Sequence, residues 1–242
     1  MRIFIIRHGD PNYAIDGLTE KGKVEVALLA KKLAKEEIDA IYCSPLGRAQ
    51  LTAKPTAEAK GLKINTLDWL REFHYAQIKV PYLETPTCPW DLLPEFVAKE
   101  AKIYSPTEWL DCPFIRDSAV PEHYKKVTAA LDALLAEHGY VRDGYNYKAL
   151  NPSHKTIVLV CHFGLSAVLL SHLLNCSPYT IWQHTVSAPT AVTTIYTEER
   201  REGTASMRAT SIGDVSHLYA EGEPPAFAAR FCECFTDNTR HD

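Results

Sequence analysis

The sequence has no long apolar run and no strong excess of charge of either sign. Its 242 residues contain no stretch of about 18 apolar residues, so we expect no membrane-spanning helix and no membrane partner. The 26 basic and 30 acidic residues leave a formal net charge of −4, which gives no electrostatic case for binding nucleic acid. Local charge can oppose net charge, so a small anionic substrate is compatible with this balance.

A disulfide framework is also missing. The seven cysteines are odd in number and scattered, which is typical of a reducing compartment. Cys232 and Cys234 form a CxC pair, but without a second pair nearby they do not predict a zinc site. The first apolar run, residues 3–6, is shorter than the apolar part of a signal peptide. We therefore expect a cytoplasmic protein.

Short apolar runs alternate with helical patterns along the chain. The runs that predict strands are residues 2–6, 38–43, 64–70, 156–161, 190–197 and 205–212. Helices are expected after the first, second and fourth runs, and Pro55 is expected to break or kink the second helix. This alternation predicts an α/β fold, a three-layer sandwich with a mostly parallel central sheet. The sequence shows no internal repeat and carries no signal for an oligomeric state.

The middle of the chain interrupts this rhythm. Residues 73–150 hold seven of the 15 prolines and one good helical pattern, residues 121–139. We interpret the chain as a single domain, residues 1–242, with a cap-like insertion at about 73–150. Aromatic residues of the insertion could line a pocket, and the segment RDGYNY, residues 142–147, is expected near the pocket mouth.

Polar side chains follow the predicted strands at the points where the strands end. Because ligands of open α/β sheets bind beyond the carboxyl ends of the strands, these side chains are expected to share one pocket. They comprise two arginines, two histidines and a glutamate, with a serine and a glycine beside them: Arg7, His8, Gly9, Ser44, Arg48, Glu72 and His162.

A phosphoryl group fits such a pocket better than a carboxylate does. Guanidinium forks and histidine donors match the oxygens of a phosphate in shape and charge, and they are too many for two oxygens. Gly9 lets the backbone approach an anion closely. The helix that starts after His162 offers free N–H groups at its positive end.

Five short motifs follow one another along the chain. They are RHG at 7–9, LTEKG at 18–22, SPLGRA at 44–49, a glutamate at 72 and CHFG at 161–164. RHG alone is a weak signal, but the ordered set is a strong one. In these motifs the sequence resembles the histidine phosphatase superfamily, in its phosphoglycerate mutase-like branch. The resemblance covers most of the chain and is poor over residues 73–150.

The resemblance implies a role for each strand-end residue. His8 would be the nucleophile and would form a phosphohistidine. Arg7, Arg48 and His162 would hold the phosphoryl oxygens and stabilise charge in the transition state. Glu72 would protonate the leaving oxygen. General chemistry is compatible with these roles, since a neutral imidazole is a competent nucleophile and an alkoxide leaving group needs a proton.

Three positions depart from the family pattern. Pro11 stands where the family often has a threonine, so one phosphate contact is missing, and Asn12 could replace it. Phe163 intervenes between the second histidine and its glycine, and its backbone N–H could bind phosphate. Glu72 is followed by FHYAQ rather than a glycine-rich stretch, which makes His74 a rival proton donor.

The expected function is a metal-independent phosphomonoesterase that hydrolyses a small phosphorylated metabolite, with no cofactor. A phosphomutase is the alternative among enzymes, and a phospho-ligand-binding protein without turnover is the alternative from another class. His8, Glu72 and His162 are also suitable ligands for zinc, but the neighbouring arginines would repel the ion. The sequence does not identify the substrate.

Overall fold

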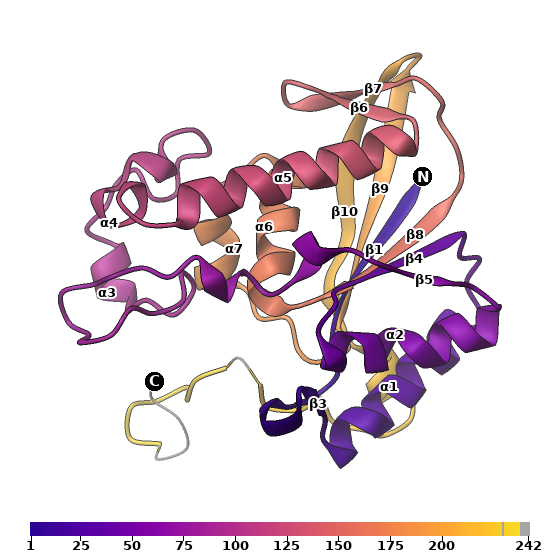
Figure 1. Ribbon diagram of the computed structural model, residues 1–242, viewed down its shortest axis with the longest axis horizontal. Coiled ribbons are helices and arrows are strands. Elements are labelled where there is room, and N and C mark those ends of the chain that lie inside the picture. The colour runs from indigo at the N-terminus through magenta and orange to yellow at the C-terminus, as the bar shows by residue number, and fades with distance from the viewer. Residues whose placement is uncertain (229, 238–242) are drawn as a thin grey trace.

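The computed structural model describes residues 1–228 and 230–237, and it is built around one large sheet with helices on both faces (Figure 1). The strand order is β5-β4-β8-β1-β9-β10-β7-β6. In that order the strands are Ile64–Thr66, Ala40–Cys43, Thr156–Cys161, Arg2–Arg7, Val192–Arg201, Thr204–Asp214, Asn146–Ala149 and Tyr140–Asp143. A small second sheet pairs β2 (Pro11–Asn12) with β3 (Gly17–Leu18).

The large sheet is mixed. Strands β5, β4, β8 and β1 are parallel to one another, whereas β9, β10, β7 and β6 pair antiparallel. The prediction of an α/β fold is confirmed, and the prediction of a mostly parallel sheet is wrong for this second half. Short turns through Gly144 and Gly203, both with positive φ, join β6 to β7 and β9 to β10, and such turns permit only antiparallel pairing.

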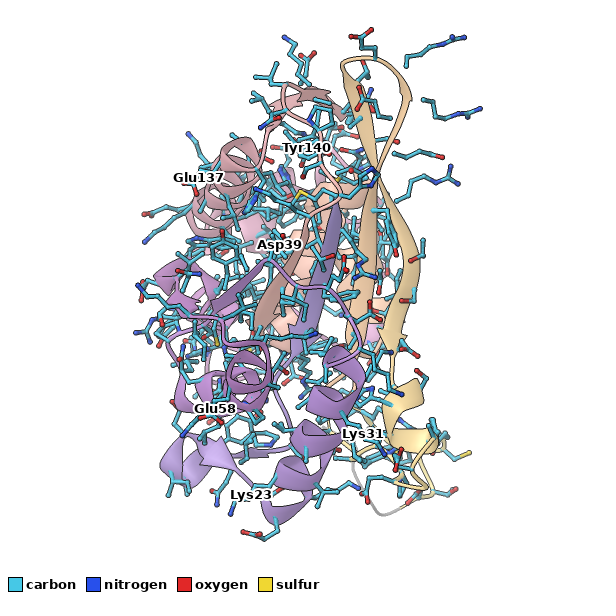
Figure 2. All side chains as sticks on the ribbon, turned by 90° about the vertical axis from the view of Figure 1, so that its right-hand side faces the viewer. Lys23, Lys31, Asp39, Glu58, Glu137 and Tyr140 are labelled. Atoms are coloured by element: carbon cyan, nitrogen blue, oxygen red, sulfur yellow. The ribbon has the colours of Figure 1, made fainter. Side chains whose placement is uncertain are left out.

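Alternation of buried side chains along the central strands builds a core on each face of the sheet. Phe4 and Ile6 face α1 (Glu20–Leu33) and α2 (Gly47–Lys60), while Ile3 and Ile5 face the other side. Lys23 and Lys31 of α1 lie on its solvent side (Figure 2).

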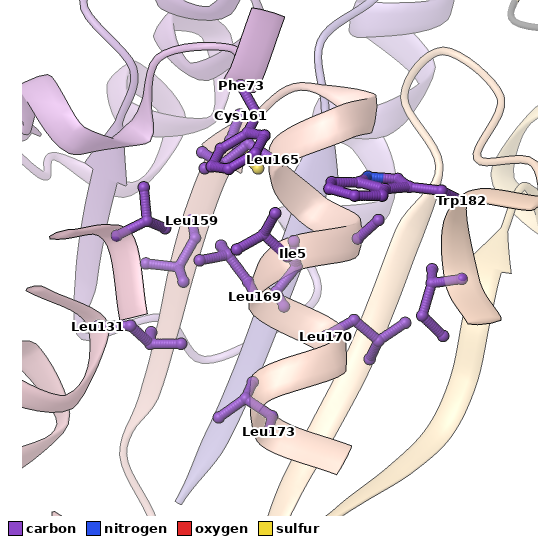
Figure 3. Packing of buried hydrophobic residues seen from close by; sticks show 14 of the residues in the cluster. Ile5, Phe73, Leu131, Leu159, Cys161, Leu165, Leu169, Leu170, Leu173 and Trp182 are labelled. Atoms are coloured by element: carbon purple, nitrogen blue, oxygen red, sulfur yellow. The ribbon is translucent and has the colours of Figure 1, made fainter. Parts of the chain in front are cut away.

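The helices of the second face are α5 (Val120–Glu137), α6 (Phe163–Leu174) and α7 (Pro178–His184). Figure 3 shows how the leucines of α6 pack with Leu131 of α5 and with Ile5 and Leu159 of the sheet. This core is continuous with the buried side chains of residues 70–115. This part of the chain is therefore attached to the sheet through a shared core.

The first part of the segment 73–150 contains four short helices, and its second part joins the main fold. The short helices are η3 (Phe73–Tyr75), α3 (Pro94–Val97), η4 (Trp109–Asp111) and α4 (Pro113–Arg116), and η2 (Asp68–Leu70) precedes them. After α5, the hairpin β6–β7 closes the edge of the sheet. The remaining helices are η1 (Tyr13–Ile15) and α8 (Ser216–Tyr219). No helix within the described residues is both long and apolar enough to cross a membrane.

Two local predictions are wrong, and of the break or kink expected at Pro55 the break does not occur. Helix α2 continues through Pro55, because burial of Ala49, Ala53 and Ala57 on one face outweighs one missing backbone hydrogen bond. The strand expected at 64–70 ends at Thr66, and η2 begins at Asp68. The segment 142–147 belongs to the β6–β7 hairpin, which pairs with β10 at Thr204 and Ala205. That end of β10 is opposite to the carboxyl end of β1 (Figure 1).

Candidate active site

His8 follows β1 and is almost completely buried, with 2% of its surface exposed. Its backbone is fixed from two sides, because its N–H donates to the Cys161 carbonyl and its carbonyl accepts from the Thr190 N–H. The ring nitrogen Nδ1 lies 2.7 Å from the Gly9 carbonyl oxygen. A carbonyl only accepts, so Nδ1 carries the proton and the lone pair is on Nε2.

The surroundings of His8 keep the ring neutral. Burial, followed by the charge of Arg7 and opposed by the Gly9 hydrogen bond, lowers the pKa of His8 from 6.5 to about 3. Arg48 donates from Nε to His8 Nε2 at 3.3 Å. The unprotonated nitrogen of His8 therefore accepts a hydrogen bond from a guanidinium group, which places a fixed positive charge beside the imidazole.

His162 follows β8 and is the N-cap residue of α6. Its ring centroid lies 5.0 Å from that of His8. Nε2 of His162 is 2.7 Å from the Ser44 hydroxyl oxygen, which also accepts the N–H of Leu46 at 3.3 Å. Ser44 can donate its own proton to Nε2, which keeps the ring proton on Nδ1. That Nδ1 atom is buried and has no partner among the described residues.

Arg7 is the last residue of β1 and is buried. Its Nη1 donates to the carbonyl oxygens of Ser187 at 2.6 Å and Ala228 at 3.4 Å. Its Nε is buried and lacks a partner within the described part of the chain. The phenyl ring of Phe163 lies 5.9 Å from the guanidinium carbon, so Phe163 forms an apolar wall beside Arg7.

Glu72 is the N-cap residue of η3, and its carboxylate points at the start of α6. Oε1 accepts the N–H groups of Phe73 at 2.7 Å and Leu165 at 2.9 Å, and Oε2 accepts that of Gly164 at 3.3 Å. The expectation that the N–H groups at this helix start are free for a phosphate is therefore wrong for Gly164 and Leu165. Burial raises the pKa of Glu72, although these three N–H groups and Arg7 oppose the shift.

The rival donor has the opposite tendency. Burial, followed by the charge of Arg48, lowers the pKa of His74. Burial thus disfavours the protonated form of His74 and favours the protonated form of Glu72.

The structure shows the surroundings of the residues that stand next to the departures from the family pattern. Asn12 caps η1, since its Oδ1 accepts the N–H of Ala14 at 3.2 Å. Gly164 carries the Trp90 ring against its Cα, because a Cβ there would lie 2.1 Å from that ring. Trp90 also contacts Phe163 edge to face. The insertion thus reaches the helix start that holds Glu72.

The described residues contain no group of three or more histidine, cysteine, aspartate or glutamate side chains that could hold a metal ion. His8 and His162 lie together, but the groups around them are Arg7 and Arg48. This charge suits an anion rather than a cation.

Comparison with known families agrees with this geometry. The model of the histidine phosphatase superfamily, branch 1, matches residues 3–210. The chain belongs to the histidine phosphatase superfamily. A probable phosphatase of Schizosaccharomyces pombe is 25% identical over 91% of this chain and 97% of its own length. A probable phosphoglycerate mutase of Yersinia enterocolitica is 28% identical over 74% of this chain and 77% of its own length.

Solved structures share the fold. A phosphoserine phosphatase of Entamoeba histolytica, crystallised as a variant with phosphoserine, superimposes with a TM-score of 0.60 at 20% identity. The superposition covers 90% of this chain and 98% of that one.

Sequence reasoning placed Arg7, His8, Arg48 and His162 together, and the structure brings them together. It missed Asp16, which binds Arg48 and is described below. It also missed the carbonyl groups of Ser187 and Ala228 on Arg7, and no sequence signal could have found these two, since a carbonyl is common to every residue.

Proposed function

We propose that this histidine phosphatase superfamily member is a metal-independent phosphomonoesterase that hydrolyses a small phosphorylated metabolite through a phosphohistidine on His8. One observation carries the proposal. In the two residues that lie closest to His8 in charge and ring contact, Arg7 and His162, one buried nitrogen each, Arg7 Nε and His162 Nδ1, has no partner in the described chain. Buried polar atoms are rarely left unpaired, and phosphoryl oxygens would pair with both.

The first step transfers the phosphoryl group to the enzyme. The lone pair of His8 Nε2 attacks phosphorus, the bond from phosphorus to the ester oxygen breaks, and that oxygen takes a proton from Glu72. Arg7, Arg48 and His162 hold the phosphoryl oxygens and stabilise their charge in the transition state. Protonated Glu72 suits this role because burial raises its pKa.

The second step returns the enzyme to its starting state. Water attacks the phosphorus of phosphohistidine, and the carboxylate of Glu72 takes the proton from this water. The nitrogen–phosphorus bond breaks, its electron pair returns to His8 Nε2, and inorganic phosphate leaves. Asn12 and the N–H of Phe163 are further candidate phosphate contacts, and this part of the proposal rests on the sequence pattern alone.

The test uses an aryl phosphate, whose leaving group hardly needs an acid. We expect turnover by the unaltered protein, resistance of that turnover to a metal chelator, and its loss in His8→Ala. Retention of phosphate binding by His8→Ala would show that the fold and the pocket survive. Tight phosphate binding by the unaltered protein with no turnover on a panel of phosphomonoesters would instead indicate a binding protein.

A phosphomutase is the second candidate, and one observation favours it. The Ala228 carbonyl contacts Arg7, the Ala226 N–H donates to Glu25, and Lys21 binds Glu223, so the segment 223–228 lies against the site. A mutase must keep its phosphoenzyme away from water. Isotopic phosphate passed from one alcohol to another, rather than to water, would establish the mutase.

A further inference from the structure

The geometry points to Asp16 as a positioning residue that orients Arg48 toward His8. The inference rests on the proposed phosphate site and assigns a role to a residue outside the motif set. Asp16 lies in the loop after η1, and Arg48 lies in the first turn of α2. Asp16 Oδ1 accepts from Arg48 Nη1 at 2.6 Å, and Oδ2 accepts the backbone N–H of Gly47 at 2.6 Å.

The carboxylate decides which nitrogens of Arg48 face the pocket. With Nη1 bound to Asp16, Nε is directed to His8 Nε2 at 3.3 Å. Nε and Nη1 are thus both engaged within the protein. A guanidinium group is a planar fork, so fixing one nitrogen fixes the direction of the other two. Asp16 thus fixes the direction of the third nitrogen, Nη2, which can donate to a phosphoryl oxygen.

The backbone conformation of Asp16 and its close approach to α2 fix the position of this loop. Asp16 adopts a left-handed conformation, with φ 45° and ψ 46°, which aspartate tolerates better than most residues. Its carbonyl oxygen would lie 2.3 Å from a Cβ at position 47, so only glycine permits this approach to α2. The same loop places the ring of Tyr13 5.4 Å from the Arg48 guanidinium carbon. A carboxylate and an aromatic face therefore hold Arg48 from the side of η1.

Asp16 is ionised under the conditions in which the site would work. Burial tends to raise its pKa, but hydrogen bonds from Gly47 and Arg48 bring the pKa of Asp16 below its ordinary value. Its side chain is 43% exposed, whereas that of Arg48 is 10% exposed. Because solvent screens the attraction between the charges, the geometry of the pair matters more than its energy.

The experiment measures binding of inorganic phosphate by titration calorimetry, and kcat and KM for an aryl phosphate. The variants are Asp16→Asn, Arg48→Ala and the double variant. Asn keeps an oxygen for the Gly47 N–H, so the loop stays seated while its grip on Arg48 weakens. We expect Asp16→Asn to weaken phosphate binding and lower kcat/KM about tenfold when Arg48 is present, and to have no further effect in Arg48→Ala.

Equal losses with and without Arg48 would overturn the inference, since Asp16 would then act on the site or the fold by another route. No loss in the presence of Arg48 would overturn it as well. Asp143→Asn is the matched control, because it removes a surface ion pair with Lys148 at the far hairpin. The unaltered protein could bind phosphate in a way that depends on the Asp16–Arg48 pair and yet show no turnover. That result would refute hydrolysis but would still support the role of Asp16.

Discussion

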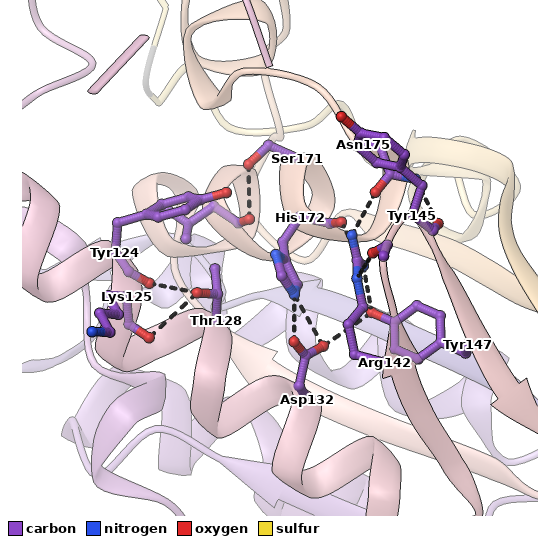
Figure 4. Close-up of polar contacts among 12 residues, drawn as sticks. Tyr124, Lys125, Thr128, Asp132, Arg142, Tyr145, Tyr147, Ser171, His172 and Asn175 are labelled. Atoms are coloured by element: carbon purple, nitrogen blue, oxygen red, sulfur yellow. Dashed lines mark hydrogen bonds and ion pairs between the residues drawn. The ribbon is translucent and has the colours of Figure 1, made fainter. Parts of the chain in front are cut away.

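Two polar clusters lie at opposite ends of α6 and contain similar residue types. One is the candidate active site at its first turn. The other joins α5, the end of α6 and the β6–β7 hairpin, and we call it the Asp132 cluster (Figure 4). Its members are Asp132, Arg142, Tyr147, His172 and Asn175.

The two clusters differ in how completely their hydrogen bonds are satisfied. In the Asp132 cluster every guanidinium nitrogen of Arg142 has a partner, and Asp132 accepts from both His172 and Tyr147. In the active site, Arg7 Nε and His162 Nδ1 have none among the described residues. A satisfied network holds elements together, whereas two unmet donors beside His8 are compatible with a place for an anion. Residue type alone does not separate the two roles.

The largest expected difference concerns the two histidines. His8→Ala should lower turnover of an aryl phosphate by roughly a thousandfold or more, because the attacking atom is lost. His172→Ala should leave kcat/KM within a few-fold and lower the melting temperature, since it removes a partner of Asp132. A large kinetic loss in His172→Ala with an unchanged melting temperature would contradict a purely structural role for the Asp132 cluster.

The role of Glu72 is tested by the leaving group of the substrate. Glu72→Gln should lower hydrolysis of an alkyl phosphate by roughly 100-fold and that of an aryl phosphate far less, since only the alkoxide requires a proton. Steady-state kinetics on matched alkyl and aryl substrates measures this ratio. Equal losses on both substrates would point away from an acid role. His74→Gln is the control, and a selective loss on alkyl phosphates there would transfer the role to His74.

Arg142 tests the Asp132 cluster directly. Arg142→Ala should reduce the free energy of unfolding by about 2 kcal/mol, because Asn175, Tyr147 and the His172 carbonyl lose their common donor. Denaturant unfolding measures the change. Phosphate binding should be unaffected, and a weakened phosphate affinity in this variant would contradict the separation of the two clusters.

The last expected effect is on the pH dependence of stability. The pKa of His8 falls to about 3 and that of His217 to about 4, both mainly through burial. Between about pH 6.5 and those values the unfolded chain binds protons that the folded protein does not. Stability should therefore fall as the pH is lowered through this window, by up to about 1.4 kcal/mol per pH unit for each such histidine. The dependence should become shallower in His8→Ala.

The sequence allowed the strand-end residues to be predicted because their positions follow from a general rule. Strands β1, β4 and β8 are parallel neighbours, so Arg7, Ser44 and His162 must emerge at one edge. The antiparallel half was not predicted, since apolar periodicity does not encode strand direction. Whether Pro55 breaks α2 could not be decided from the sequence, because propensity is local, whereas burial of the alanine face is tertiary.

The contacts that tune the site were beyond the sequence for the same reason. Asp16 lies 32 residues from Arg48, and the Glu72 carboxylate lies 93 residues from the Leu165 N–H that binds it. Such pairs become visible only when the loops are placed in space.

The stereochemistry at phosphorus tests the central claim most directly. A monoester made chiral with three oxygen isotopes can be turned over with an acceptor alcohol present, and the configuration of the transferred phosphoryl group can then be determined. Transfer through His8 consists of two in-line displacements, so we expect retention of configuration. Inversion would mean that the acceptor attacks the substrate directly, and it would contradict a phosphohistidine on His8.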